Sequence, residues 1–151
     1  MDKFDLMIID ELQNNGKISI VELGKQIGLS TSATSERVKK LEQEGIIDGY
    51  RAIINGEKVG MDITAFITIQ LGSMSIYEMA KMLSNIPQVQ ECHKVTGDAC
   101  FLVKVKVRNT RELELMLDKI SHVTPNTYTY LVLSTIKETT RINVENEDDI
   151  E

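Results

Sequence analysis

Hydroxyl and cationic side chains gather on one face of a short predicted helix in the first third of the chain. Within residues 31–44, the hydroxyls come first and the bases follow, opposite an inner stripe that contains Val38 and Leu41. Hydroxyls can bond to base edges or phosphates, and small side chains let a helix approach the major groove closely. The candidate nucleic-acid contacts are Thr31, Ser32 and Ser35 near base edges, and Arg37, Lys39, Lys40 and the later Arg51 near phosphates.

Acidic residues on the same helix oppose this interpretation. Glu36, Glu42 and Glu44 offset the local positive charge, so the helix is not a basic stripe that would bind nucleic acid tightly by charge alone. The alternative is a plain helical hairpin in a small core, and the spacing does not separate the two interpretations. The polar outer face of the second helix favours DNA binding.

The elements that hold this face are two helices joined by a tight turn. Ser19, followed three residues later by Glu22, has the pattern of a capping box at the start of the first helix. Gly28 ends that helix, because glycine readily adopts the positive φ of a tight turn. Ser30 is placed to cap the second helix. The predicted inner residues are Ile20, Leu23, Ile27, Thr34, Val38 and Leu41.

A preceding helix and a following strand complete a small first unit. After Asp2, apolar residues recur at helical spacing until the chain reaches Asn14. Residues 46–54, with a turn at Asp48 and Gly49, are expected to form a small β-wing or a linker strand. A short turn between two helices, with a polar outer face on the second, is typical of a DNA-binding helix-turn-helix.

The second half of the chain alternates strands and helices. The predicted elements are strands over 63–71, 89–95, 101–107 and 127–136, with helices over 75–84 and from 110. This order is the split βαβ arrangement, in which both helices cover one face of an antiparallel sheet. The predicted fold class is therefore α+β, with an N-terminal winged helix-turn-helix and a C-terminal ferredoxin-like βαββαβ sandwich.

The predicted sheet has apolar residues on both faces. Phe101, Val103, Val105 and Val107 can face the helices. The other face also carries apolar residues, which are Leu102 with either Leu131 and Leu133 or their alternates Tyr128, Tyr130 and Val132. An exposed sheet face is expected to be more uniformly polar. We therefore expect a second copy of the chain to cover it, which gives a homodimer.

Composition and charge limit the mode of DNA recognition. The 151 residues include no Trp and 5% aromatic residues, so base stacking on aromatic rings is not expected. The formal charge of −6 becomes −1 without the five acids of residues 145–151, which we expect to form a disordered tail. Recognition by so neutral a body would depend on dimer geometry more than on bulk charge.

No recognisable catalytic or metal-binding pattern occurs. His93 and His122 are isolated from any recognisable nucleophile, and there is no glycine-rich phosphate loop with its lysine. Cys92 and Cys100 flank a predicted hairpin, but with scattered histidines they are too few for a zinc site, and we expect free thiols. We expect no enzyme activity, cofactor or metal. The short apolar runs and the lack of a signal-peptide pattern favour a cytoplasmic protein without a membrane partner.

These motifs together resemble a known family, the Lrp/AsnC (feast/famine) transcription regulators, over nearly the whole chain. Residues 5–13 look like the family's opening helix, and segments 22–24, 28–30, 37–42 and 45–47 follow at its spacing. Residues 97–105 resemble its glycine–aspartate hairpin. The resemblance implies double-stranded DNA as a partner. It also implies dimers formed through the second domain, which often assemble into octamers as tetramers of dimers.

The resemblance also implies an amino-acid effector that binds between dimers near the hairpin. By itself, a Gly-Asp turn needs only backbone freedom and local hydrogen bonds. The effector candidates carried over from the family are Thr96, Gly97, Asp98, Ala99 and Cys100. The pair Ala99 and Cys100 departs from the family's common pattern, in which a polar or aromatic residue precedes an acid.

We therefore expect a sequence-specific transcriptional regulator modulated by an amino acid or related metabolite. Two alternatives stay open, an effector-independent architectural DNA binder and a ligand-sensing or interaction module without DNA binding. The predicted divisions are a winged helix-turn-helix domain over 1–54, a linker over 55–61, a ferredoxin-like effector and oligomerisation domain over 62–144, and an acidic tail over 145–151.

Overall fold

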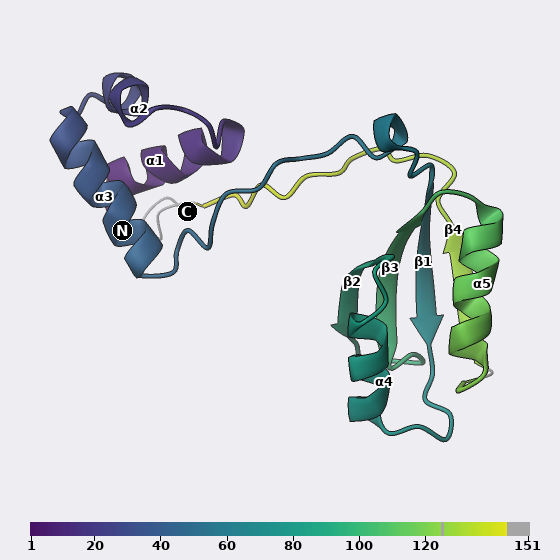
Figure 1. Ribbon diagram of the computed structural model, residues 1–151. Coiled ribbons are helices and arrows are strands. Elements are labelled where there is room, and N and C mark those ends of the chain that lie inside the picture. Colours follow the sequence, from purple (N-terminus) through teal and green to yellow (C-terminus); the bar gives the residue numbers. More distant parts are fainter. Residues whose placement is uncertain (125, 145–151) are drawn as a thin grey trace. The chain divides into compact units, whose positions relative to one another are not determined.

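The structure is a computed structural model that describes residues 1–124 and 126–144 (Figure 1). The chain forms two compact units. One contains Met1–Ile53 together with the segment from Glu138, and the other contains residues 54–137. The second unit thus ends before residue 144, where the sequence placed its end. The predicted acidic tail, residues 145–151, lies outside the described residues.

Three helices build the described part of the first unit. They are α1 (Lys3–Asn14), α2 (Ile20–Ile27) and α3 (Thr31–Gln43), capped by the side chains of Asp2, Ser19 and Ser30. Ser19 Oγ accepts a hydrogen bond from the Glu22 backbone N–H at 3.2 Å, which is one half of the predicted capping box. A complete capping box lies instead at the start of α1, between Asp2 and Asp5.

Apolar residues of all three helices meet in one small core. Its buried members are Ile8, Leu23, Ile27, Val38 and Leu41. Thr34 is fully buried as well, which confirms the inner stripe predicted for α3, whereas Ile20 of α2 is half-buried. Gly28 ends α2 with φ of 76°, in the left-handed region that glycine adopts without strain. The predicted three-helix arrangement is confirmed.

The segment after α3 does not form the predicted strand. Residues 46–56, all within the described part of the chain, contain no strand. The backbone N–H groups of Ile46 and Ile47 donate to the Leu41 carbonyl, and the Tyr50 hydroxyl donates to Glu42 Oε1 at 3.0 Å. A strand needs a hydrogen-bonded neighbour, and these groups bond to α3 instead.

In its described residues, the second unit contains a four-stranded sheet and two helices. Its elements are a 3₁₀ turn, η1 (Glu57–Val59), and then β1 (Ile63–Ile69), α4 (Ile76–Ser84), β2 (Val89–Lys94), β3 (Phe101–Val107), α5 (Thr110–Ser121) and β4 (Thr127–Leu131). The strands lie in the order β2-β3-β1-β4, and all pairs are antiparallel. The predicted ferredoxin-like order and the α+β class are confirmed.

Two element boundaries differ from the prediction. β4 pairs with β1 from Thr127 to Leu131 and ends there, not at residue 136, because β1 begins at Ile63 and offers few further partners. The cap of α5 is Asn109, whose side chain accepts a hydrogen bond from the Glu112 backbone N–H at 2.9 Å, and not Thr110. Asparagine is a somewhat better N-cap than threonine, which agrees with this choice.

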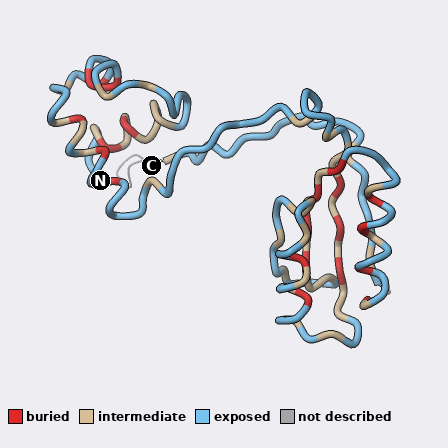
Figure 2. The backbone as a smooth tube through the Cα atoms, viewed as in Figure 1, coloured by how far each residue is buried: buried red, intermediate tan, exposed pale blue. Residues whose placement is uncertain are grey.

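Both helices pack against the same face of the sheet (Figure 2). The buried core residues on this side are Ala65, Ile67, Ile69, Met79, Leu83, Phe101, Val103, Val105, Val107, Leu113, Met116 and Ile120. The opposite face carries Phe66, Leu102, Tyr128 and Tyr130, because Tyr130 pairs with Phe66 and Tyr128 pairs with Thr68. The register therefore selects the tyrosines, and not Leu131 and Leu133, as neighbours of Leu102.

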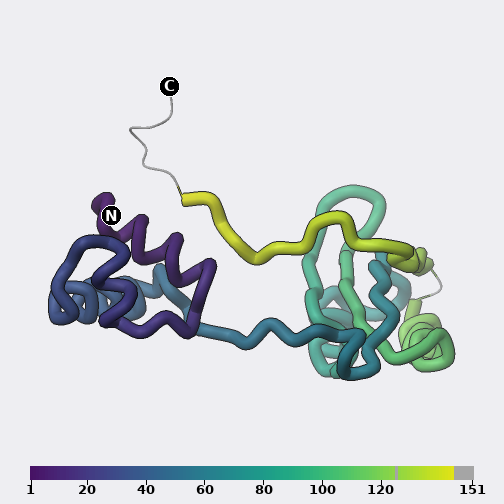
Figure 3. Tube along the Cα trace, turned by 90° about the horizontal axis from the view of Figure 1, so that it is seen from above, coloured from purple at the N-terminus to yellow at the C-terminus, as the bar shows by residue number. Residues whose placement is uncertain are grey.

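The C-terminal segment returns to the helices of the first unit (Figure 3). The Gln13 side-chain amide makes two hydrogen bonds with the backbone of Ile142, at 3.0 Å to its carbonyl and 2.7 Å from its N–H. The Arg141 guanidinium bonds to Asp10 and to Asn14. The last turn of α1 is thus fastened to a segment that the sequence assigned to the other domain.

Candidate nucleic-acid interface and effector site

The outer face of α3 presents polar side chains as the sequence predicted. Thr31 and Ser32 in its first turn are exposed, and Ser35 one turn further is half-buried. Ser32 Oγ lies 3.1 Å from the hydroxyl of the capping residue Ser30. Short hydroxyl side chains at the start of a helix leave room for a groove wall to approach the backbone. The start of α3 can therefore approach base edges in a DNA groove.

A close approach between α2 and α3 fixes the angle of this surface. Gly24 of α2 has no side chain, and a Cβ there would lie 2.9 Å from both the Leu29 carbonyl oxygen and Thr34 Oγ1. The Thr34 hydroxyl donates to the Ser30 carbonyl at 2.9 Å, and the Leu29 N–H donates to the Gly24 carbonyl at 2.8 Å. Thr34 was predicted as an inner residue from its helical spacing, whereas the role of Gly24 was not predicted.

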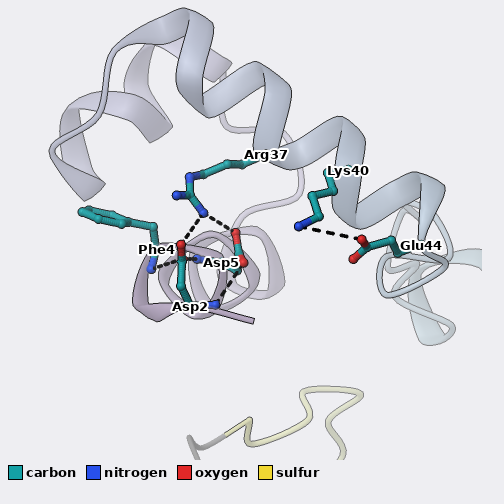
Figure 4. A network of polar contacts seen from close by, with 6 residues as sticks. All are labelled: Asp2, Phe4, Asp5, Arg37, Lys40 and Glu44. Atoms are coloured by element: carbon teal, nitrogen blue, oxygen red, sulfur yellow. Dashed lines mark hydrogen bonds and ion pairs between the residues drawn. The ribbon is translucent and has the colours of Figure 1, made fainter.

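The guanidinium of Arg37, a predicted phosphate contact, is held at the start of α1 (Figure 4). Arg37 Nη1 donates to Asp2 Oδ2 at 2.7 Å and to Asp5 Oδ1 at 2.8 Å. The guanidinium carbon also lies 5.5 Å from the centre of the Phe4 ring, within range of a cation–π contact. The side chain is therefore engaged with the start of α1, because two carboxylates there attract it more strongly than open solvent does.

The pKa shifts at this cluster follow the same contacts. The Asp5 carboxylate, followed by that of Asp2, raises the pKa of the Arg37 guanidinium. The Asp5 backbone N–H, and then the Arg37 guanidinium, lower the pKa of Asp2. Asp2, Phe4 and Asp5 were missed as members of the site. The two aspartates, at the N-cap and three residues later at N3, carried the signal of a capping box.

The remaining predicted cations are exposed. Lys39 is solvent-exposed on α3, and Arg51 is exposed in the segment that follows it. Lys40 lies 3.8 Å from the Glu44 carboxylate one turn later (Figure 4). An exposed pair of this kind contributes about 0–1 kcal/mol, so a phosphate can compete for the lysine. These three side chains are available to an anionic partner.

The predicted effector residues form the loop between β2 and β3. Thr96, Gly97 and Asp98 are exposed, and Ala99 and Cys100 are half-buried. Gly97 has φ of 113°, a conformation in which any other L-residue would be strained. The Val95 N–H donates to the Cys100 carbonyl at 3.0 Å, and the Cys100 N–H donates to the Ile69 carbonyl at 2.9 Å. The loop is thus tied to the sheet and presents Asp98 to solvent.

Metal ligands, thiols and membrane-spanning helices were also sought among the described residues. Among residues 1–124 and 126–144, no group of three or more His, Cys, Asp or Glu side chains could hold a metal ion. Cys92 and Cys100 are free thiols, and burial raises the pKa of Cys92. No helix in this part of the chain is long and apolar enough to cross a membrane.

A helix-turn-helix unit joined to a ferredoxin-like domain defines a class of two-domain DNA-binding transcriptional regulators, and comparison with known proteins specifies the family. Residues 1–48 match the model for winged helix-turn-helix DNA-binding, and residues 64–142 match the model for the Lrp/AsnC ligand binding domain. The winged helix-turn-helix class is thus confirmed, although no strand follows α3 within residues 46–56. The chain belongs to the Lrp/AsnC family.

Individual relatives match over nearly the whole chain. The HTH-type transcriptional regulator FL11 of Pyrococcus furiosus is 36% identical over 146 residues, which cover 95% of this chain and 97% of the relative. The leucine-responsive regulatory protein of Haemophilus influenzae is 37% identical over 92% of this chain and 87% of its own length. A transcriptional regulator of Neisseria meningitidis, solved in complex with L-Met, has a TM-score of 0.90 at 29% identity, covering 95% of this chain and 96% of that one.

Proposed function

We propose that this regulator reads two DNA half-sites as a homodimer, and that an amino acid or related small metabolite changes its DNA binding. The observation that carries the proposal is the outer face of α3, which presents hydroxyls and then cations while its inner face is fastened to α2 at Gly24. Because DNA is the proposed partner, we also propose that the protein acts in the cytoplasm.

In the proposed complex, α3 lies in the major groove. Thr31, Ser32 and Ser35 would lie near base edges, where short hydroxyls can read donor and acceptor patterns. Lys39, Lys40 and Arg51 would contact phosphates, which position the helix without reading sequence. We omit Arg37 from these contacts, because two carboxylates hold its guanidinium.

The open face of the sheet supports the proposed dimer. Tyr128 and Tyr130 remain 62% and 58% exposed there, beside the half-buried Phe66 and Leu102. Aromatic residues gathered on one solvent-facing sheet surface favour burial against another protein surface. A second copy offers the same surface, and two-fold pairing is the commonest symmetry of soluble oligomers. We extend the proposal to a tetramer of dimers on the strength of the family resemblance.

The loop between β2 and β3 is the proposed effector site. Thr96, Gly97 and Asp98 are exposed there and followed by the half-buried Ala99 and Cys100, so backbone groups could hold a carboxylate while Asp98 attracts an amine. The Neisseria regulator in complex with L-Met shows that a protein of very similar fold binds an amino acid. Such a ligand alters DNA binding only if it prefers one assembly over another.

Selection from a randomised duplex library tests DNA recognition. We expect the parent protein to enrich a two-fold symmetric sequence and to lose affinity steeply as salt rises. Lys40→Ala should weaken binding to all duplexes and lower the salt slope by about 0.9 for each phosphate that the protein no longer neutralises. Lys81→Ala on α4, also an exposed helical lysine, is the matched control. Binding without sequence preference would favour the architectural alternative, and no binding would favour the sensor alternative.

Calorimetry with each of the twenty amino acids, together with DNA-binding assays with and without each, tests the effector site. We expect at least one amino acid to bind and to change DNA affinity. Asp98→Ala should abolish that change and leave binding of the free protein to DNA intact, whereas Asp62→Ala, another exposed aspartate of the same unit, should retain it. If no amino acid binds at millimolar concentration, the effector part of the proposal is wrong.

A further inference from the structure

We propose that Arg37 is a positioning residue, which clamps α3 to the N-terminal cap of α1 and so sets the angle at which α3 meets DNA. The inference rests on the proposed DNA binding and assigns to Arg37 a role other than phosphate contact. Its basis is a closed network of contacts among Asp2, Phe4, Asp5 and Arg37 (Figure 4).

Each carboxylate in the network has two functions. Asp2 Oδ1 accepts from the backbone N–H groups of Phe4 and Asp5 at 2.9 and 3.0 Å, while its other oxygen accepts from Arg37. Asp5 Oδ2 accepts from the Asp2 N–H at 3.0 Å, while its other oxygen also accepts from Arg37. The cap of α1 and the clamp on α3 therefore form together.

The network is partly withdrawn from solvent. The side chain of Asp5 is 10% exposed and that of Arg37 is 31% exposed, whereas that of Asp2 is 52% exposed. A charge-assisted hydrogen bond in such a place is stronger than one between exposed groups, because less water competes for it. The Phe4 ring lies beside the guanidinium and restricts its movement further. Both ionic bonds are made by Nη1, so a phosphate would have to displace them to bond to that nitrogen.

The position of Arg37 on α3 supports the same conclusion. Two residues along an α-helix turn the side-chain direction by about 200°, so Arg37 and Ser35 lie on opposite flanks of α3. Thr34 meets α2 near the start of α3, and Arg37 meets α1 about one turn later. These two attachments restrict both the tilt of α3 and its rotation about its own axis. The hydroxyls of Thr31, Ser32 and Ser35 are held outward as a result.

A positioning role and a contact role predict opposite results for one substitution. Asp5→Asn keeps the shape of the side chain and weakens its hold on the Arg37 guanidinium. If Arg37 were a phosphate contact, its release from Asp5 would make it available to DNA and tighten DNA binding. If Arg37 positions α3, the same release loosens the angle of α3 and lowers affinity for the selected sequence more than affinity for other sequences.

The experiment uses the full chain and the duplex selected from the randomised library, beside a scrambled duplex of equal length. The variants are Arg37→Gln, Asp5→Asn and, as the phosphate-contact comparison, Lys39→Ala. Affinities are measured over a range of salt, at a temperature where circular dichroism shows each variant to be fully folded. The two readouts are the ratio of the two affinities and the slope of log affinity against log salt.

We expect Arg37→Gln to lower the affinity ratio about tenfold, the effect of roughly one mismatched base pair, and to leave the salt slope unchanged. Asp5→Asn should also lower the affinity ratio. This variant tests the contact between Arg37 and α1 if Arg37→Gln fails to fold. Lys39→Ala should lower the slope by about 0.9 for each phosphate left without its cation, at a constant ratio.

Three outcomes would overturn the inference alone. They are a folded Arg37→Gln variant with the parent's affinity ratio, an Arg37→Gln salt slope that falls as in Lys39→Ala, and an affinity ratio of Asp5→Asn that is not below the parent's. A parent protein that selects no DNA sequence overturns the proposed function, and this inference with it. The result of the DNA selection with the parent protein therefore distinguishes a failure of the proposed function from a failure of this inference.

Discussion

Gly24→Ala should destabilise the helical unit, although alanine is the better helix former. In an exposed helix interior this substitution would stabilise by about 1 kcal/mol. Here the new Cβ would lie 2.9 Å from the Leu29 carbonyl oxygen and from Thr34 Oγ1, closer than such atoms approach one another. The carbonyl belongs to the backbone of the turn, and the hydroxyl is held by its bond to the Ser30 carbonyl, so neither can easily move.

The magnitude follows from these two opposing effects. Overpacking of a closed interface costs about 1–3 kcal/mol, and a contact with fixed backbone belongs at the upper end. After subtraction of the helix-propensity gain, we expect a net loss of about 1–2 kcal/mol in unfolding free energy. Amide hydrogen exchange of α2 and α3 in the full chain measures this loss, because it reports the opening of one unit separately from the other.

Gly16→Ala is the matched control for this experiment. A Cβ at Gly16 would meet its nearest atom, Tyr50 Cδ1, at 3.6 Å, which is ordinary contact. Thr34→Ala combined with Gly24→Ala should recover part of the loss, because it removes one of the two clashes and leaves the Leu29 carbonyl in place. If Gly24→Ala protects the amides of α2 and α3 as well as the parent does, the close approach is not what restricts this position.

Three further predictions concern other parts of the chain. Tyr130→Glu places a charge on the open sheet face, where Tyr130 is 58% exposed, and should shift the chain toward the monomer in light scattering without unfolding it. Burial and then the hydrogen bond to Glu42 raise the pKa of Tyr50 to about 12. Because the pKa of Tyr50 is higher in the folded than in the unfolded chain, the protonated side chain stabilises the fold fully below a pH of about 10, the pKa in the unfolded chain. This stabilisation is lost as pH rises toward 12. Denaturation curves of the parent and Tyr50→Phe should therefore converge over that interval. Arg141→Ala removes the bonds to Asp10 and Asn14 and should speed amide exchange at Ile142. The free energy of unfolding should fall by less than about 1 kcal/mol, because the Arg141–Asp10 pair is exposed. Unchanged exchange would show that the Gln13 bonds alone hold this segment.

The order and type of the elements could be predicted from the sequence because the signals are local. Helical spacing of apolar residues, the capping residues Asp2, Ser19 and Ser30, and the left-handed Gly28 depend on neighbours within a few positions along the chain. The β3 boundaries were predicted correctly for the same reason, since alternation from Phe101 to Val107 is visible in the sequence. Family resemblance connected these local signals to DNA binding.

Contacts between segments distant in the sequence decided the rest. Arg37 was predicted to face phosphate because its charge is visible in the sequence, whereas the carboxylates that hold it lie more than thirty positions earlier. The attachment of residues 141–142 to α1, and the choice of Tyr128 and Tyr130 for the open sheet face, depend on contacts and strand register that no local pattern encodes. The sequence by itself determined which elements form and which faces are polar. The tertiary structure decided which charges remain available to a partner, because that depends on which oppositely charged groups the fold brings within hydrogen-bond distance.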